Sequence, residues 1–597
     1  MSAVSGSPAN RKRMTDRAVL TDSRRLPGPN RLLERPGAVA DVALPDADAE
    51  AIIRAWRRHV AAMLAAVGWD REEATVLRFP GGASLAITAP VDALYAATEV
   101  NEWAWAAALA DAGAVDPDLP APPALASAAE ALRAAIAAER NPALLAMMAA
   151  AHEHDVACVR DDRMVSVGLG SGSLSFPVDA IPGPSAVDWT RVHDVPVVLV
   201  TGLNGKTTTV RLVAAMARAA GRHTGWSCTE GVYVDGEPLG TGDFSGPEGA
   251  RQVVRDPRVE TAVLETARGG MLRRGLAIER ANVAVVTNIA TDHFGEFGVH
   301  DLAALTETKL VIARAIGPGG RLVLNAEDPH LTGAAASLRV PLAWFGIDPD
   351  GEVLSRAGAA GKQIATLYDT MLVLRRAAET IPLVPLAEVP IAFGGAARHN
   401  VANALAASLA AWCLGLPPEA IRAALRSFGR GHDENLGRTN LFDYRGARIL
   451  LDYAHNPHGM DALAALARQL PAARRLVLIG QAGDRDDDAI RGLARSACAI
   501  RPDRVIIKEM TSYLRGRPEG QIPALMREEL ERDGIPAEAI TVSEGELAGV
   551  EEALAWAQEG DLLVLTVHAE RPAVLELLAA SGATVVVTPS EAAPQSP

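Results

Sequence analysis

The sequence predicts a multidomain α/β protein. Two observations predict that class: apolar runs of strand length alternate with helical patterns from about residue 189 onward, and one of the first runs ends in a glycine turn that enters a helix directly. Such alternation is typical of mostly parallel sheets covered by helices. The length of 597 residues and the 49% hydrophobic content are enough for three or four buried cores.

The amino-terminal part of the chain offers no recognisable chemistry. Residues 1–30 are predicted to be a disordered tail, because they are polar and end in RRLPGPN, where prolines and a glycine oppose regular structure. Residues 31–188 are predicted to form an α+β region. Its expected elements are helices at 48–67 and 126–154 and a strand at 84–90. The segment 168–189 is rich in glycine, serine and proline, and we interpret it as a linker or a wide turn.

Two series of strands divide the rest of the chain. A central domain, residues 189–437, is predicted to hold a mostly parallel sheet, and a C-terminal domain, residues 438–597, is predicted to be Rossmann-like. The central strands are expected at 195–200, 261–266, 282–288 and 321–325. The C-terminal strands are expected at 448–456, 475–480, 504–509, 539–544, 562–567 and 583–588. A helical stretch at 398–415 lies between the two series.

The stretch TGLNGKTTT, residues 201–209, predicts a phosphate site in a P-loop ATPase domain. A strand that passes through a glycine turn into a helix directs backbone amides and the positive end of the helix dipole at one point, where an anion can bind. Lys206 adds a charge for the outer phosphates, and Thr207 offers a hydroxyl oxygen to magnesium. The expected nucleotide-binding residues here are Gly202, Asn204, Gly205, Lys206, Thr207 and Thr208. The full P-loop pattern has a glycine where Val200 stands, and a plain strand–helix turn with a solvated lysine is the alternative.

Further polar residues follow the next strands. Glu265 ends one strand, where its carboxylate can hold magnesium at the same sheet edge, although such a glutamate is often only a helix cap or surface residue. Asn288, Asp292 and His293 follow the next strand, and Lys309 comes after them. Each position alone is a weak signal, whereas their order along the chain is informative.

Composition excludes several classes of protein. The 58 basic and 73 acidic residues give a formal net charge of −15, which argues against nucleic acid as a partner. The four cysteines are widely spaced and predict neither a metal centre nor disulfides, so a reducing cytoplasm is expected. No stretch of 18 apolar residues occurs, and the basic amino terminus lacks an apolar segment, so no membrane association is expected.

The motifs in this order resemble those of the Mur ligase superfamily, whose members make amide bonds with ATP. The resemblance rests on TGLNGKTTT, LETARGG, TNIATDH, ARHNVANALAA, the Gly-Arg pair at 437–438 and LDYAHNPHG, and it covers about 195–597. The stretch LETARGGMLRRGL, with GDRDDD and LRGRPEG further on, is similar to the carboxy-terminal ligase module of the cyanophycin synthetase family.

The resemblance implies a role for each matching residue. Lys206 and Thr207 would hold the phosphates and a first magnesium ion, with Glu265 as its carboxylate ligand, and His293 would bind a second magnesium ion. Lys309 matches a lysine that is carbamylated in many of these ligases; the alternative is an exposed helix lysine paired with Glu307 or a nearby acid. Asn400 and Asn403 would contact the adenine, and Arg438 would reach the phosphates from the C-terminal domain. Asp452 would orient that domain as a lid, and His455 and Asn456 would lie beside the amine. As alternatives, HNVAN can be a capped helix start and DYAHNP a turn after a strand.

The implied reaction is an ATP-dependent ligation. A substrate carboxylate attacks the γ-phosphate to give an acyl phosphate, and an amine, in the first instance that of an amino acid, then displaces phosphate. Both steps gather negative charge, which two magnesium ions, Lys206 and Arg438 would offset. His455 can accept the proton that the amine loses, because the pKa of histidine ordinarily lies near neutrality.

Two features depart from the family pattern. Leu203 stands where these ligases have a small hydroxyl residue, and its amide is still expected to point into the loop. Cyanophycin synthetase also has an ATP-grasp module between its amino-terminal region, which RRLPGPNRLLE resembles, and its ligase module; only a short glycine-serine segment separates the two here. By analogy, the substrates would be an aspartate side-chain carboxyl and a basic amino acid. A separate ATP-grasp ligase as partner and a homo-oligomer are both compatible with the sequence.

Two other functions remain as alternatives. A nucleotide-binding scaffold or regulator that has lost ligation would explain Leu203 and the isolated amino-terminal region, but not the retention of Glu265, His293 and Lys309. A P-loop small-molecule kinase would leave the order of the motifs and the C-terminal α/β domain unexplained.

Overall fold

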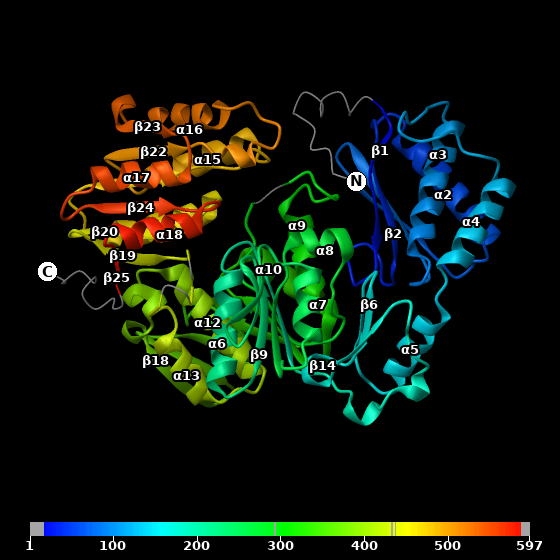
Figure 1. The fold of residues 1–597 in the computed structure, drawn as a ribbon, viewed down its shortest axis with the longest axis horizontal. Helices are drawn as coiled ribbons and strands as arrows, with labels where there is room; N and C mark the ends of the chain where they lie inside the picture. The colour runs from blue at the N-terminus through cyan, green and yellow to red at the C-terminus, as the bar shows by residue number, and fades with distance from the viewer. Residues whose placement is uncertain (1–16, 292–293, 432–433, 436, 587–597) are drawn as a thin grey trace.

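The computed structural model describes residues 17–291, 294–431, 434–435 and 437–586, and within them the strands form four sheets. The amino-terminal region (blue) and the C-terminal sheet (orange and red) lie on opposite sides of a large central sheet (green) in Figure 1. Two α/β units built on these larger sheets confirm the predicted fold class. Among the described helices, none combines the length and apolar character that crossing a bilayer requires.

The central sheet is parallel in its middle and antiparallel at both edges. In spatial order its strands are β11 (Glu237–Thr241), β10 (Gly231–Val234), β9 (Thr224–Cys228), β12 (Thr261–Glu265), β8 (Val197–Thr201), β13 (Ala281–Val286), β14 (Ile316–Asn325), β15 (Leu342–Phe345), β16 (Gln363–Tyr368), β17 (Met371–Arg376) and β18 (Glu379–Pro385). Each neighbouring pair of strands between β9 and β16 in this order is parallel, and the pairs outside that stretch are antiparallel. The strands expected at 195–200, 261–266, 282–288 and 321–325 are β8, β12, β13 and β14, in the centre of this sheet.

Helices cover both faces of the central sheet. All five residues of β8 are buried, and alternate side chains enter two separate cores, with Val198 in one and Leu199 in the other. The first core contains α6 (Lys206–Ala219), α12 (Arg398–Cys413) and α13 (Pro418–Ser427); the second contains α7 (Pro247–Arg255), α8 (Arg268–Arg274) and α9 (Leu302–Leu310). A central strand buried on both faces needs a continuous apolar run, which is why β8 is recognisable in the sequence.

The second large sheet belongs to the C-terminal part of the chain. Its order is β23 (Ile540–Ser543), β22 (Arg504–Lys508), β21 (Arg475–Ile479), β24 (Leu562–Thr566), β20 (Ala447–Asp452), β19 (Asn440–Tyr444) and β25 (Thr584–Val585). All neighbours from β23 to β20 are parallel, and β19 is antiparallel to both of its neighbours. We keep residues 188 and 437 as proposed domain boundaries, because each falls outside the strands and helices that flank it.

Two expectations for the amino-terminal region are wrong. The predicted disordered tail contains β1 (Val19–Leu26), which pairs along its length with β2 (Gly37–Ala43) in a sheet completed by β4 (Gly82–Thr88) and β3 (Ala74–Phe79). The prolines of RRLPGPN follow this strand and do not interrupt it. The predicted linker contributes β7 (Leu174–Pro177), which pairs with β6 (Met164–Val167) beside β5 (Cys158–Arg160).

The amino-terminal region is joined to the central domain through a buried arginine. Arg24 of β1 ion-pairs with Asp41 and Asp22, and its Nε donates to the carbonyl of Leu272 in α8 at 2.9 Å. The Arg24 side chain is 5% exposed, Asp41 is 6% exposed and Asp22 is 38% exposed. The guanidinium also lies 4.5 Å from the ring centre of Phe297. These contacts fix β1 against the helix that follows β12.

Arg24→Ala should loosen this junction much more than Asp22→Ala. Removal of the guanidinium leaves Asp41 buried without its cation, which costs about 3–5 kcal/mol, whereas the half-exposed Asp22 contributes less than about 1 kcal/mol. Hydrogen–deuterium exchange of the β1 and β2 peptides measures the difference. Equal protection in the two variants would contradict the assignment of Arg24 as the anchor.

Candidate functional site

A cavity of about 590 Å³ is lined by residues from both the central and the C-terminal sheet domains. It lies where the strands β8, β12, β13 and β20 end. The predicted site residues that line it are Gly202, Asn204, Gly205, Lys206, Thr207, Thr208, Glu265, Asn288, Lys309, Asn400, Asn403, Arg438, Asp452 and His455. Asp292 and His293 lie outside the described residues. The sequence therefore predicted one shared location for residues that are up to 253 positions apart (455 − 202).

The loop between β8 and α6 depends on two glycines. Gly205 precedes the helix with φ 82°, and a Cβ there would lie 2.1 Å from Oδ1 of Asn403 in α12. Gly202 has φ 141°, and a Cβ there would lie 1.9 Å from Oγ1 of Thr287. Glycine is needed at both positions, because the loop touches neighbours on both sides in conformations that side chains disfavour.

The loop leaves the first turn of α6 facing the cavity. Its earlier amides are already paired: Leu203 donates to the carbonyl of Asn288 at 3.0 Å, and Asn204 donates to Oδ1 of Asn288 at 2.9 Å. The expectation that the Leu203 amide points into the loop is thus wrong. Anion binding would depend on the amides at the start of α6, where the helix dipole is positive, together with Lys206, whose Nζ donates to the carbonyl of Leu203 at 2.8 Å.

Glu265 is the centre of a small oxygen cluster. It is 2% exposed at the end of β12, so it is not a surface residue. Its Oε2 accepts from the Thr207 hydroxyl at 2.8 Å, and its Oε1 accepts from the Thr229 hydroxyl at 3.0 Å. Carboxylate and hydroxyl oxygens are ligands that suit Mg²⁺. Within the described ranges, no group of three or more His, Cys, Asp or Glu side chains could hold a metal ion, so a cation here would also need oxygens from a ligand or water.

Lys309 is buried rather than exposed. It is 3% exposed in α9, and its Nζ donates to the carbonyl of Gly202 at 2.8 Å, beneath the loop that precedes α6. Glu307, the partner expected in the alternative interpretation, ion-pairs instead with Arg31 at 2.8 Å. The interpretation of Lys309 as a solvated helix lysine is therefore wrong.

The HNVAN motif forms part of the cavity wall. Asn400 and Asn403 lie in α12, and Nδ2 of Asn403 donates to Oδ1 of Asn400 at 3.1 Å. Neither asparagine caps the helix, whose N-cap is Ala397, so the capped-start alternative is wrong. Nδ2 of Asn400 is buried without a hydrogen-bond partner in the described part of the chain. A buried unpaired donor at a cavity wall fits a ligand that supplies an acceptor.

The DYAHNP loop links the second sheet to the first. Asp452 accepts from the amide of Thr439 at 2.8 Å and from its hydroxyl at 2.9 Å, which fixes the segment beside Arg438. Asn456 caps α14 (Pro457–Gln469) and also forms a reciprocal amide pair with Asn204, each hydrogen bond being 3.1 Å. The family resemblance implies a place for Asn456 beside the amine. In the structure its side chain contacts Asn204 in the loop between β8 and α6.

His455 lies near a buried polar pair, His568 and Lys508, which the sequence patterns did not indicate. Nδ1 of His455 is 3.1 Å from the carbonyl of Tyr453, and the rings of His455 and His568 are 6.4 Å apart. Lys508 is a donor only, so Nδ1 of His568 accepts from it at 3.0 Å, and Nε2 of His568 donates to the carbonyl of Ala454 at 3.1 Å. Burial lowers the pKa of His568 well below its ordinary value, so this ring is neutral and holds the loop of His455.

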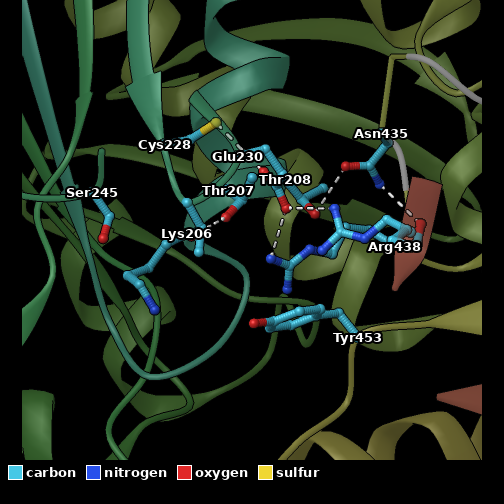
Figure 2. A network of polar contacts seen from close by, with 12 residues as sticks. Lys206, Thr207, Thr208, Cys228, Glu230, Ser245, Asn435, Arg438 and Tyr453 are labelled. Carbon is cyan, nitrogen blue, oxygen red and sulfur yellow. Dashed lines mark hydrogen bonds and ion pairs between the residues drawn. The ribbon is translucent and has the colours of Figure 1, made fainter. Parts of the chain in front are cut away.

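Glu230 is a second residue that the sequence analysis missed (Figure 2). Its Oε1 lies 3.1 Å from Arg438 and 3.2 Å from Arg571, and its Oε2 lies 3.5 Å from Arg211. Burial by itself would raise the pKa of Glu230, but the guanidinium groups around it lower the value to about 2. The Arg438 guanidinium lies 4.2 Å from the ring centre of Tyr453, so the predicted phosphate contact is held in a defined position.

This arrangement defines a protein with two α/β domains whose strand ends share one polar cavity. Residues 200–411 match the model of the Mur ligase middle domain, and residues 437–567 match that of the Mur ligase glutamate ligase domain. UDP-N-acetylmuramate–L-alanine ligase of Xylella fastidiosa (strain M12) is 30% identical over 380 residues, which are 62% of this chain and 71% of the relative. The chain belongs to the Mur ligase family, as its motifs predict.

Other similarities concern cyanophycin synthetases and a solved ligase structure. Cyanophycin synthetase of Trichormus variabilis is 39% identical over 332 residues, 56% of this chain and 37% of the relative, and that of Crocosphaera subtropica is 35% identical over 373 residues, 62% of this chain and 42% of the relative. The chain thus spans about two fifths of the length of these relatives. The E. coli FolC structure with DHPP and ADP is 22% identical, with a TM-score of 0.48, and the match covers 64% of this chain and 89% of FolC.

Gly205→Ala should weaken binding of an ATP analogue about 10-fold or more, since each 1.4 kcal/mol lost is tenfold in affinity. Gly221→Ala is the matched control: Gly221 lies just beyond the other end of α6 with φ 79°, but a Cβ there would have no neighbour within 4 Å. Both variants carry the left-handed backbone cost, and only Gly205→Ala displaces Asn403. Titration calorimetry checks the difference, and equal affinities would refute the role of this contact.

Proposed function

We propose that this protein is an ATP-dependent amide ligase that activates a substrate carboxylate as an acyl phosphate and couples it to an amine, in the first instance that of an amino acid. The observation that carries this proposal is the convergence of the α6 loop, Glu265 and Arg438 on one cavity between two sheet domains. A P-loop small-molecule kinase would leave the contribution of the C-terminal domain to this cavity unexplained. The two-domain cavity supports a reaction in which a third molecule enters from the second domain.

ATP fits this cavity in a definite orientation. Asn400 and Asn403 would contact the adenine, since Asn400 has an open buried donor there, and the start of α6 with Lys206 would hold the phosphates. Asn288 supports the loop by accepting a hydrogen bond from the Asn204 amide. The Thr208 hydroxyl donates to Oδ1 of Asn435 at 3.3 Å, in the segment that leads to Arg438. Thr207 and Glu265 would hold Mg²⁺, which would supply positive charge beside the phosphates. A second Mg²⁺ at His293 is also part of this proposal.

Lys309 would act as a carbamylated lysine. Its Nζ donates to the Gly202 carbonyl, and Lys309 lines the same cavity as Thr207 and Glu265, the proposed cation ligands. Carbamylation replaces a cation by an anionic group with two oxygens, which are ligands that Mg²⁺ prefers. In this buried position the modified side chain would complete the oxygen set around the metal.

The chain's own residues would serve both steps of the ligation. Lys206 and Arg438 would offset the charge that develops when the carboxylate attacks the γ-phosphate, and the cleft between the two domains would keep water from the acyl phosphate. The amine would approach from the DYAHNP loop, where His455 lines the cavity and can take up the proton. His568 holds that loop through Ala454, so it would orient His455 without contacting substrate.

The substrates are proposed from analogy with the cyanophycin synthetase relatives. An aspartate side-chain carboxyl and a basic amino acid, arginine or lysine, are the first pair to test. A separate ATP-grasp ligase would then supply any second ligation step.

Lys206→Ala and Glu265→Ala should each lower amide formation by at least about 100-fold, because each removes charge stabilisation from the transition state. Phosphate release with mass detection of the product measures this, and wild-type release should require both a carboxylate and an amine. Release with the carboxylate alone would favour a kinase, and ATP binding without turnover would favour a scaffold. Circular dichroism should show that both variants remain folded.

Lys309→Ala should lose ligation that short carboxylic acids partly restore, because the added acid replaces the anionic oxygens of the carbamate. Lys362→Ala is the matched control, since Lys362 lies outside the residues that line the cavity. Phosphate release with and without added acetate gives the comparison. Full activity of Lys309→Ala without acid would show that no carbamate is required.

A further inference from the structure

Glu230 connects two parts of the site that come from different domains. It lies in the turn between β9 and β10 of the central sheet, whereas Arg438 and Arg571 belong to the C-terminal sheet domain. Arg211, the third arginine at this carboxylate, comes from α6, the helix that follows the phosphate loop. One carboxylate therefore contacts cations from both sides of the domain boundary (Figure 2).

The same turn also reaches the proposed cation site. Thr229, the residue before Glu230, donates to Oε1 of Glu265, whose other oxygen accepts from Thr207. The turn thus contacts the oxygen cluster through one residue and the arginines through the next. A movement of this turn would change the position of the Glu265 carboxylate and of the Arg438 guanidinium together.

Local packing restricts where the two arginines of the C-terminal domain can lie. Their guanidinium groups are 4.2 Å (Arg438) and 5.1 Å (Arg571) from the ring centre of Tyr453. Gly437 has φ 69°, and a Cβ there would lie 2.7 Å from Nε of Arg571, so only glycine leaves room for this arrangement. Arg438 and Tyr453 both line the cavity. The guanidinium of Arg438, which lines the cavity, is therefore held by an aromatic ring and by a carboxylate.

Stability does not explain this cluster well. The side chains of Glu230 and Arg571 are each 11% exposed, and that of Arg438 is 19% exposed. Burying ion pairs costs desolvation energy that their attraction often fails to recover, so well-packed apolar residues would stabilise the boundary at least as well. Buried charges that are kept beside a cavity are typical of functional sites.

We propose that Glu230 is a positioning residue: it holds Arg438 at the terminal-phosphate end of the cavity and couples that position to Glu265 through the Thr229–Glu230 turn. This inference rests on the proposed ligase function and goes beyond it, because Glu230 is expected to contact neither ATP nor substrate. Arg571 shares the carboxylate and Tyr453 with Arg438, and so prevents Arg438 from turning away from the cavity.

Glu230→Gln in the full chain tests the proposal, because it keeps the size of the side chain and removes its charge. The expected result is a kcat lower by on the order of 10- to 100-fold. The Kd for ADP should stay within about threefold of wild type, since Arg438 acts only at the terminal phosphate. Glu230→Asp, which keeps the charge, should recover part of the loss in kcat.

Asp561→Asn is the matched control. Asp561 is a buried carboxylate that ion-pairs with Arg474 at 2.6 Å, and the Arg474 guanidinium lies 3.9 Å from the ring centre of Trp556, so the geometry is similar but lies outside the residues that line the cavity. It should lower the thermal midpoint and leave kcat unchanged. Equal kcat in Glu230→Gln and Asp561→Asn would overturn the proposal. A higher kcat in Glu230→Gln would also overturn it, since Glu230 would then compete with the phosphate for Arg438.

The outcome for wild type separates this inference from the proposed function. If wild type binds nucleotide but releases no phosphate with any acid and amine, the ligase proposal fails. The role of Glu230 is then judged by affinity alone: Glu230→Gln should weaken binding of AMP-PNP and leave ADP binding unchanged. Equal losses for both nucleotides would overturn it.

Discussion

The close contact between the loop after β8 and its two neighbours is the constraint on which the site depends. Gly202 lies against Thr287 at the end of β13, and Gly205 lies against Asn403 in α12. Because both contacts leave no space for a side chain, the start of α6 has one position relative to the sheet and to the helix that would hold the adenine. The positions of Lys206, of the Thr207 hydroxyl and of the Asn204 side chain follow from that single placement.

The two sheet domains contribute different chemistry to the cavity. The central sheet provides the helix N-terminus and the oxygen cluster around Glu265, which suit a triphosphate and a cation. The C-terminal domain provides Arg438 just before β19, Asp452 at the end of β20 and His455 just after it. A reaction that needs both sets can proceed only while the domains are in contact. In the proposed ligase, the same contact would enclose the acyl phosphate and keep water from it.

Sequence patterns predicted the central strands and the residues that immediately follow them, because buried parallel strands are continuous apolar runs and their carboxyl ends share one edge. The same reasoning missed Glu230, because the strand that precedes it, β9, reads TGWSC and lacks a continuous apolar run. It also missed β1, since the charged residues of VLTDSRRL include Arg24, which is buried through ion pairs rather than through apolar character. Contacts that depend on tertiary ion pairing leave no local periodicity, so Arg571 and Lys508 had no signal either.

The link between Asn204 and Asn456 differs in kind from the other contacts across the domain boundary. It is a pair of hydrogen bonds between uncharged amides, whereas the contact at Glu230 is a cluster of ion pairs. Hydrogen bonds between amides weaken steeply when their angles change, whereas the attraction among buried charges falls off only gradually with distance. The boundary therefore has one contact that fixes the orientation of the two domains and another that tolerates small displacements, so that a slight shift of the C-terminal domain need not release its arginines from Glu230.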